Sequence, residues 1–257
     1  MYWTNRARVL EAVRKDGDNI RFATKFYADR EIMMEAVKQY GVALQFADKS
    51  LQSDKELVME AVKQHGWALH FADQSLQCDR EIVLAAVKQT GCTLKYAGKS
   101  LQSDREIVLA AVKQNGFALY DANEFLQKDK EIVMEAVKQN GEVLKYANII
   151  FQKDKKIVME AVKRNGSVLS FVDESFQSDK DIVMEAVKQD GTSIAFATDT
   201  FKKNKEIVMT AVQQNMYALG FVNFADNPLK KDKEFLLEVS KFYPYVFSNF
   251  ADKSLRN

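Results

Sequence analysis

Apolar and polar positions follow one another along this chain in a pattern that returns about every 25 residues. The tetrapeptide Ala-Val-Lys-Gln, or a close variant of it, occurs nine times, with a spacing of 24 residues once and 25 residues each time after that. A tenth, degenerate copy starts at Asp232, after a three-residue expansion around Asn227-Pro228. Periods of this length are typical of repeat proteins whose units stack on one another. The nine tetrapeptides begin at Ala12, Ala36, Ala61, Ala86, Ala111, Ala136, Ala161, Ala186 and Ala211.

Within one copy, residues 79–103, the pattern first predicts a long amphipathic helix. Asp79 supplies the side-chain oxygen that a helix N-cap needs. An apolar stripe at helical spacing follows. Gly91 stands where a left-handed residue would end the helix, after about eleven residues. The stripe consists of Ile82, Val83, Ala86 and Val87, and Leu84 widens it.

A second, shorter helix is expected after this glycine, over residues 93–97. Its apolar side chains, those of Leu94, Tyr96 and Ala97, are expected to point inward. Leu101 should then anchor the loop that leads to the next Asp cap. A unit of this size is too small to bury its own apolar faces, but stacked units can bury them against their neighbours.

We therefore predict an all-α protein, an α-solenoid of about ten helix-turn-helix repeats, each with a long and a short helix. Residues 1–257 are expected to form one such domain. Residues 29–231 carry the regular repeats. Residues 1–28 and 232–257 are expected to be capping repeats, because a terminal repeat must shield an end that has no neighbour.

The most aromatic segment of the chain lies near its C-terminus. It comprises Phe242–Phe247, together with Phe250. Shielding of the last repeat is the interpretation that we favour for these rings, because a solenoid end exposes apolar surface. A docking surface or a dimer contact is the alternative.

The repeat consensus carries a resemblance to a known family. It reads Asp-Lys/Arg-Glu-Ile-Val-Met-Glu-Ala-Val-Lys-Gln-Asn-Gly-x-Ala-Leu-x-Phe/Tyr-Ala-x-x-x-Leu-Gln. This consensus resembles the short helical repeat catalogued as domain of unknown function 4116, and the resemblance covers nearly the whole chain. It implies an all-helical repeat and brings no catalytic residues. The first copy, the Asp121 position and the last copy depart from the pattern.

Composition narrows the possible functions. The 37 basic and 36 acidic residues leave a net charge of only +1, which argues against a general polyanion binder. Two cysteines, Cys78 and Cys92, are too few for a disulfide scaffold and are interpreted as inert thiols in a reducing compartment. Neither a signal peptide nor a membrane-spanning run is evident. We expect a cytoplasmic monomer, or a protein in the host cytosol if it is a secreted effector.

Residues that could carry chemistry are scarce. His65 and His70 are five residues apart across a glycine, and this is not the spacing of a helical metal pair. The carboxylates recur from repeat to repeat, which marks them as caps and solvated side chains, whereas a catalytic pair should break the repeat. We therefore expect no enzyme, no metal site and no cofactor.

Asp121 is the nearest thing to such a break. It stands in a column that we take to be apolar core. Burying an unpaired carboxylate there would cost on the order of several kcal/mol of folding free energy. We favour a local slip in register that lets Tyr120 and Phe125 fill the space. The alternative is a functional acid in a gap of the stack. Other copies have Phe71, Tyr96, Tyr146, Phe171 or Phe196 in this column.

A variable row marks the candidate surface for a partner. The position after each turn glycine and the position three residues later share one helix face, and both vary between repeats. Exposed aromatic rings on a regular scaffold are anchors for a protein partner. Packing of these rings against the next repeat is the alternative. A non-catalytic scaffold for protein–protein interaction is thus predicted, with the candidate residues Trp67, His70, Phe117, Tyr120 and Tyr217.

Lysines in and just after the loops before the long helices suggest a second function. In a solenoid they would line one edge, near helix N-termini that favour anions. Nucleic acid or anionic lipid could bind there. The Asp caps lie in the same row, so we favour a solvated edge. The candidate residues are Lys128, Lys153, Lys155, Lys156, Lys202, Lys203, Lys230 and Lys231.

Overall fold

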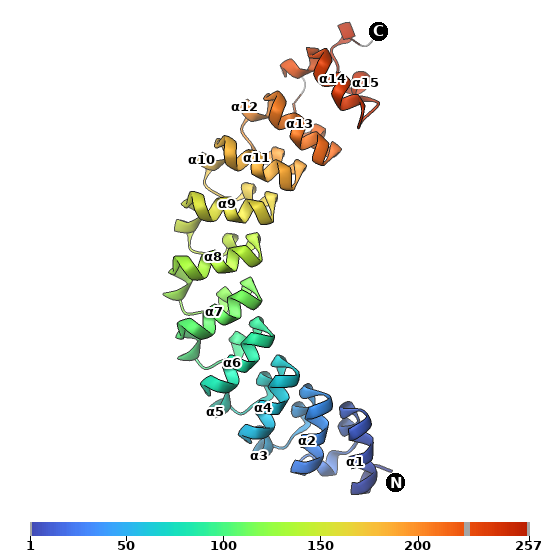
Figure 1. Cartoon of the computed structure of the whole chain (residues 1–257), viewed down its shortest axis with the longest axis vertical. Coiled ribbons are helices and arrows are strands. Elements are labelled where there is room, and N and C mark those ends of the chain that lie inside the picture. The colour runs from blue at the N-terminus through green and yellow to red at the C-terminus, as the bar shows by residue number, and fades with distance from the viewer. Residues whose placement is uncertain (1, 224–226, 256–257) are drawn as a thin grey trace. The chain divides into compact units, whose positions relative to one another are not determined.

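The structure, a computed structural model, describes residues 2–223 and 227–255. All regular elements in these two ranges are α-helices or 3-10 helices, and none is a strand. Contacts divide the chain into two compact units, Met1–Gln139 and Asn140–Asn257. Within each unit the long helices stack side by side in chain order (Figure 1). The predicted all-α solenoid is therefore confirmed, while the expected capping repeats at 1–28 and 232–257 stay predictions.

Ten long helices occur in the described residues, one for each predicted repeat. The Asp79 carboxylate caps its helix as predicted, because its Oδ1 accepts the backbone N–H groups of Glu81 (3.0 Å) and Ile82 (3.2 Å). The four residues of the predicted apolar stripe are buried in each of the second to ninth copies. The helices are α1 (Arg6–Lys15), α2 (Arg30–Gln39), α4 (Lys55–Gln64), α6 (Arg80–Gln89), α7 (Arg105–Gln114), α8 (Lys130–Gln139), α9 (Lys155–Arg164), α11 (Lys180–Gln189), α13 (Lys205–Gln214) and α14 (Lys233–Ser240).

A short 3-10 helix follows each of the first nine long helices. The residue before it is extended, and in six copies an Asn or Asp there caps the new helix, as Asn115 does for Phe117. One face of the 3-10 helix is buried, but Tyr96 is only half-buried, so its predicted inward orientation is wrong. The elements are η2 (Gly17–Phe22), η4 (Gly41–Phe46), η5 (Gly66–Phe71), η6 (Gly91–Tyr96), η8 (Gly116–Asp121), η10 (Gly141–Lys145), η12 (Gly166–Ser170), η13 (Gly191–Phe196) and η14 (Met216–Phe221).

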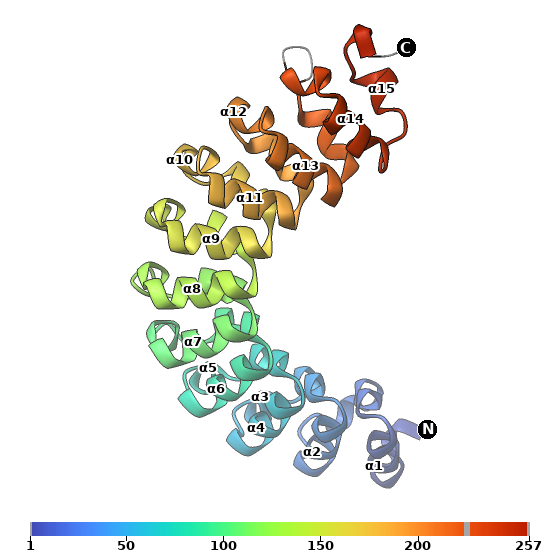
Figure 2. The same cartoon turned by 45° about the horizontal axis from the view of Figure 1, so that its top comes forward.

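The segment expected to be a loop is a third helical turn. Leu101 is buried there as predicted, and Gln102 Nε2 donates to the carbonyl of Leu94 at 3.2 Å, so both side chains tie the turn to the 3-10 helix. Figure 2 shows two of these turns, α10 and α12, at one end of the long helices of their unit. They are α3 (Lys49–Gln52), α5 (Gln74–Gln77), η7 (Leu101–Ser103), η9 (Leu126–Lys128), η11 (Ile149–Lys153), α10 (Glu174–Gln177), α12 (Asp199–Lys202) and η15 (Pro228–Lys231).

A few short elements complete the described chain. Two of them, η1 (Tyr2–Thr4) and η3 (Thr24–Phe26), belong to the first repeat. Two others, α15 (Val246–Asn249) and η16 (Lys253–Leu255), follow the last long helix. At the expansion before that helix, Asn227 is buried and donates from Nδ2 to the carbonyl of Lys202 at 2.8 Å, which joins the last repeat to the one before it.

The turn glycines have a different role from the one expected. No described glycine has a positive φ, so the predicted left-handed cap at Gly91 is wrong. Each of these glycines begins a 3-10 helix that passes against the long helix of the next repeat. A Cβ on Gly66 would lie 2.6 Å from the carbonyl oxygen of Ala86, which is far inside van der Waals contact. The glycine is therefore needed because two backbones approach closely, not because of its φ angle.

The Gln of the repeated tetrapeptide joins neighbouring repeats. Gln89 Oε1 accepts the backbone N–H of Gly66, and its Nε2 donates to the carbonyl of Lys63 at 2.6 Å. Gln114 accepts from Gly91 in the same way, at 2.6 Å. One amide side chain thus satisfies a free N–H and a free C=O at the end of the preceding long helix. In the other unit, Gln189 and Gln214 repeat the contact with Gly166 and Gly191.

A ladder of ion pairs runs along the starts of the long helices. Arg30 donates from Nε to Asp54 and from Nη2 to Glu56 of the next repeat, both at 2.6 Å. The hydrogen bond from Arg30 is the main reason why the pKa of Asp54 lies below its ordinary value. The other cations of this ladder are Arg6, Lys55, Arg80 and Arg105 in the first unit and Lys155, Lys180 and Lys205 in the second.

We predict that Gly191→Ala destabilises the second unit by about 1–3 kcal/mol, because the new methyl group would collide with the carbonyl oxygen of Ala211. Gly220→Ala is the matched control, since a Cβ there meets no atom within 4 Å. Urea denaturation followed by far-ultraviolet circular dichroism should show a lower midpoint for the first variant and an unchanged or higher one for the second. Equal midpoints would contradict the close-approach argument.

The ladder predicts a pH-dependent stability. Because the pKa of Asp54 is lowered in the folded state, its contribution is complete above the unfolded pKa of about 3.9 and is lost as the pH falls through the folded value. Arg30→Gln should therefore lower the urea midpoint at pH 7. The difference from wild type should shrink as the pH falls below the unfolded-state pKa of about 3.9. Lys63→Gln, an exposed cation outside the ladder, serves as the control. A deficit for Arg30→Gln that is independent of pH would refute this account.

Candidate functional site

The variable row predicted from the sequence lies on the outer side of the 3-10 helices. Trp67 and Tyr120 are 41% and 47% exposed, His70 is exposed, and Phe117 is half-buried. These four residues share the unit Met1–Gln139. Tyr217 is 74% exposed but belongs to the other unit, so the structure does not bring it together with them.

The rings of the third and fourth repeats contact one another across the stack. The Tyr96 ring centroid lies 5.8 Å from that of Trp67 and 4.4 Å from that of His70. The Lys95 ammonium sits over both Trp67 and Tyr96, 4.9 Å from each centroid. In the fifth repeat, Phe117 and Tyr120 stack on each other with centroids 6.5 Å apart. Trp67 and His70 therefore pack against the next repeat and still keep exposed surface.

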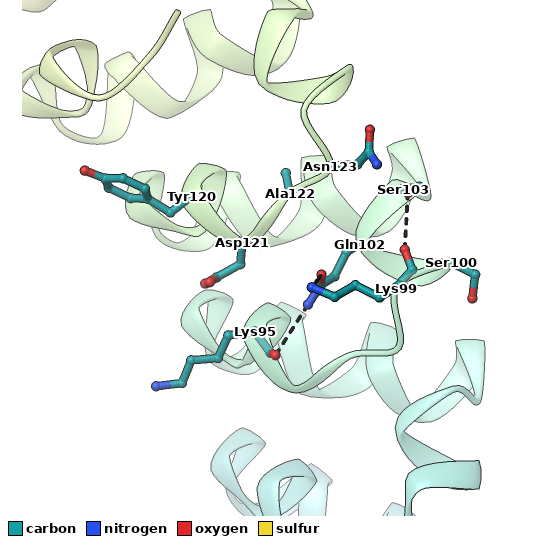
Figure 3. A pocket seen from close by; sticks show the side chains of 9 residues that line it. All are labelled: Lys95, Lys99, Ser100, Gln102, Ser103, Tyr120, Asp121, Ala122 and Asn123. Carbon is teal, nitrogen blue, oxygen red and sulfur yellow. Dashed lines mark hydrogen bonds between the residues drawn. The ribbon is translucent and has the colours of Figure 1, made fainter.

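Two hollows flank this cluster. The first lies between the third and fourth repeats, and the second lies between the fourth and fifth. The first has a volume of about 460 Å³ and the second about 520 Å³, and Lys95 and Lys99 line both. The second hollow is drawn in Figure 3. The other residues of the first hollow are His70, Gln74, Gln77, Cys78, Tyr96, Ala97 and Gly98; those of the second are Ser100, Gln102, Ser103, Tyr120, Asp121, Ala122 and Asn123.

Asp121 lies in the second hollow without any shift in register. Its 3-10 helix spans the same positions as its counterparts, and Ala122 is buried as Ala97 is. Tyr120 and Phe125 do not fill the space, since they are 47% and 83% exposed. The predicted slip is therefore wrong. Its premise fails because this column lies at the rim of the repeat, where the rings of other copies are half-buried or exposed.

The Asp121 carboxylate is half-buried, and among the described residues no hydrogen bond or ion pair at contact distance engages it. Burial raises its pKa, and the charges of Lys95 and Lys99 oppose that rise only in part. Lys99 Nζ instead donates to Gln102 Oε1 at 3.0 Å. In Figure 3 the carboxylate points from the ribbon toward the side of the hollow where Lys95 lies. The side chain is thus placed to accept a hydrogen bond from a bound group.

Sequence reasoning missed Lys95, Lys99 and Tyr96 as parts of this site. One signal was available in the column that caps the third helical turn. Asp48 and Asp73 hold this position in the second and third repeats, and each caps its turn by accepting a backbone N–H. The next two repeats have Gly98 and Asn123 there. The column thus has no carboxylate in the fourth and fifth repeats, and Asn148 and Thr198 show the same change in two later repeats. Comparing this column between copies would have drawn attention to these repeats.

The lysines of the predicted edge are not gathered into one basic surface. Lys155 pairs with Asp179 at 2.6 Å as part of the ladder, and Lys153 lies 3.5 Å from Asp173. Lys128 pairs with Glu124 at 2.6 Å in the other unit. Lys156 and Lys203 are exposed, and Lys202 is half-buried. The positive charges of Lys230 and Lys231 attract the carboxylate of Asp252 and help to lower its pKa. Carboxylates thus accompany this edge, as the Asp caps suggested.

The remaining candidates have structural surroundings. His65 Nδ1 accepts the backbone N–H of Gly41 at 3.2 Å, the contact that Gln89 makes with Gly66. Near the C-terminus, the Tyr243 ring centroid lies 6.1 Å from those of Tyr245 and Phe250. No group of three or more potential metal ligands occurs in the described residues. Over the same residues, every helix is too short or too polar to cross a lipid bilayer.

We predict that Asp121→Asn raises the urea midpoint at pH 7 but not at pH 3. The folded state raises the pKa of Asp121 above the unfolded value of about 3.9, so the ionised carboxylate opposes folding above that range and has no such effect below it. Denaturation curves at both pH values measure the difference. A gain of equal size at pH 3 would show that the effect does not come from ionisation.

Comparison with known proteins identifies the repeat. The profile of one family, described as Domain of unknown function (DUF4116), matches eight overlapping windows, which together cover most of the chain. The windows are residues 5–52, 29–77, 54–102, 79–127, 104–152, 129–177, 154–202 and 179–225. No curated protein and no solved structure matches the chain. Because the matched windows run through nearly all of its repeats, the chain belongs to the DUF4116 family, as the consensus indicated.

Proposed function

We propose that this protein is a non-catalytic repeat scaffold that binds another protein through the 3-10 helix face of the unit Met1–Gln139. The observation that carries the proposal is the group of partly exposed rings, Trp67, Tyr96 and Tyr120, beside two hollows. Large rings next to concave surface are the usual centres of binding energy in protein interfaces. They lie on a scaffold whose repeats are joined by hydrogen bonds and ion pairs, so little order has to be gained on binding.

The variability of the row supports a role in recognition. The position of Trp67 carries Val42 in the repeat before it and Cys92 in the repeat after it, so stacking does not require an aromatic ring there. The rings are nevertheless held in place by contacts with the next repeat. A side chain that is dispensable for packing but ordered by it is well suited to be an anchor.

A catalytic role is not favoured by the surroundings of Asp121. The Ser103 hydroxyl beside it donates to the carbonyl of Lys99 at 3.2 Å, so it is engaged elsewhere. Within the described part of the chain, no nucleophile is hydrogen-bonded to the Asp121 carboxylate. Nucleophilic and acid–base catalysis both need such a pairing. Binding of nucleic acid or lipid along the lysine edge is not favoured either, because Lys128, Lys153 and Lys155 face carboxylates.

We predict that Trp67→Ala and Tyr120→Ala each abolish capture of the protein partner from a cytosolic extract, because each removes an anchor ring, while the helical circular dichroism stays unchanged. Phe221→Ala is the control: this ring is also 47% exposed but lies in the other unit. Capture is run at low and high salt and measured by mass spectrometry against the wild-type bait. Undiminished capture by both variants would exclude this face as the binding surface.

A further inference from the structure

The charge around the two hollows indicates which kind of partner fits them. We infer that the surface made of both hollows and the two lysines between them, called here the Lys95–Lys99 site, takes an extended acidic segment of the partner. This inference rests on the proposed function and adds the chemistry of the ligand. It follows from three observations: the charges that line the hollows, the state of the two ammonium groups, and the side chain that keeps the second hollow open.

The first hollow has no carboxylate in its lining. Its ionisable side chains are those of Lys95 and Lys99, together with the His70 imidazole, the Cys78 thiol and the Tyr96 phenol. Where the preceding repeats place a capping aspartate, this repeat has Gly98, and a Cβ there would meet the Cys78 sulfur. The hollow is therefore positive, although the chain as a whole is almost neutral. An acidic side chain is the complementary ligand.

The two ammonium groups are not used in ion pairs at contact distance. Lys95 lies over aromatic rings, and Lys99 donates to the amide of Gln102. The ladder lysines behave differently: Lys55, for example, lies 2.8 Å from Asp79. A ligand carboxylate could therefore bind Lys95 and Lys99 without breaking an existing ion pair. It would also lie beside the Tyr96 ring, in a setting less hydrated than the open surface, where a charge-assisted hydrogen bond is stronger.

Asp121 keeps the second hollow open. The equivalent residue of the preceding repeat is Tyr96, whose ring helps to line the first hollow. The shorter Asp121 leaves this space free next to the amide groups of Gln102 and Asn123. Its carboxylate can accept a backbone N–H of an extended chain. The ligand's acidic side chains would then lie in the first hollow, which Lys95 and Lys99 line and Asp121 does not, while its main chain crosses the second hollow.

The inference is tested with the 257-residue chain and an array of ten-residue peptides that each carry one Tyr and three Glu, three Gln or three Lys. Hits are quantified by fluorescence anisotropy. The charge-reversal variant Lys95→Glu/Lys99→Glu is compared with Lys88→Glu/Lys113→Glu, which makes the same change at two exposed lysines of long helices in the same unit. Asp121→Asn and Asp121→Tyr separate the effect of the charge from that of the open space. Circular dichroism confirms that every variant is folded.

We expect the Glu peptides to bind wild type best and to lose affinity as salt rises. The Lys95/Lys99 reversal should weaken binding at least about tenfold and the control reversal by less than about twofold. Asp121→Asn should bind acidic peptides as tightly or about two- to threefold more tightly, because a repulsive charge is removed. Asp121→Tyr should weaken binding about tenfold or more, because its ring would fill the hollow.

Preference for Lys peptides, loss of affinity in Asp121→Asn, or equal effects of the two charge reversals would each overturn the inference. A single-stranded RNA 20-mer included in the array would overturn it if it bound more tightly than every peptide. If Trp67→Ala still abolishes partner capture while no Glu peptide binds, the proposed function stands and only the acidic ligand is refuted. If capture is also unchanged in Trp67→Ala and Tyr120→Ala, both proposals fall.

Discussion

Close approach between the backbone of one repeat and the long helix of the next is the contact on which this structure depends. At Gly66 the chain passes so near the carbonyl of Ala86 that no side chain fits between them. This closeness lets the Gln89 amide reach back to the end of the preceding helix. Where the glycine is replaced by Met216, the side chain is 40% exposed and the next repeat begins three residues late. Small residues therefore set the spacing of the stack, and the polar contacts between repeats follow from it.

Some positions of the repeat are needed for stacking and others are not, so a function can be sought at the positions that stacking leaves free to vary. The glycine, the alanine beneath it and the tetrapeptide Gln are tied to stacking, so they recur with little change. The positions of Trp67 and Asp121 lie at the rim, and their replacement does not open the stack. Asp121 shows this well, since its repeat keeps the same helix bounds as its neighbours. A departure from the consensus at the rim can therefore alter the surface without altering the fold.

The sequence predicted those features that depend on local chemistry. The Asp79 cap and the apolar stripe of its helix are short-range signals, and both were correct. The role of Gly91 was wrong because helix caps and close backbone contacts both select glycine, and only the second depends on a neighbouring repeat. The slip at Asp121 was wrong because column depth follows from the 3-10 geometry, which the apolar pattern does not specify. Lys95 and Lys99 were missed because their significance lies in a carboxylate that other turns carry, such as Asp73, and that is absent at Gly98.

Although the net charge of the chain is close to zero, charge is arranged differently on two of its surfaces, the starts of the long helices and the third helical turns. Along the starts of the long helices, a cation such as Arg30 meets two carboxylates of the next repeat, so charge there serves stacking and leaves little field for a ligand. At the third helical turns, the cap changes from Asp73 to Gly98, and Lys95 and Lys99 form no ion pair at contact distance with any described residue. Net charge argues against a general polyanion binder but says nothing about a site a few residues wide. In a repeat protein, the arrangement of charge from one copy to the next is therefore more informative than its sum.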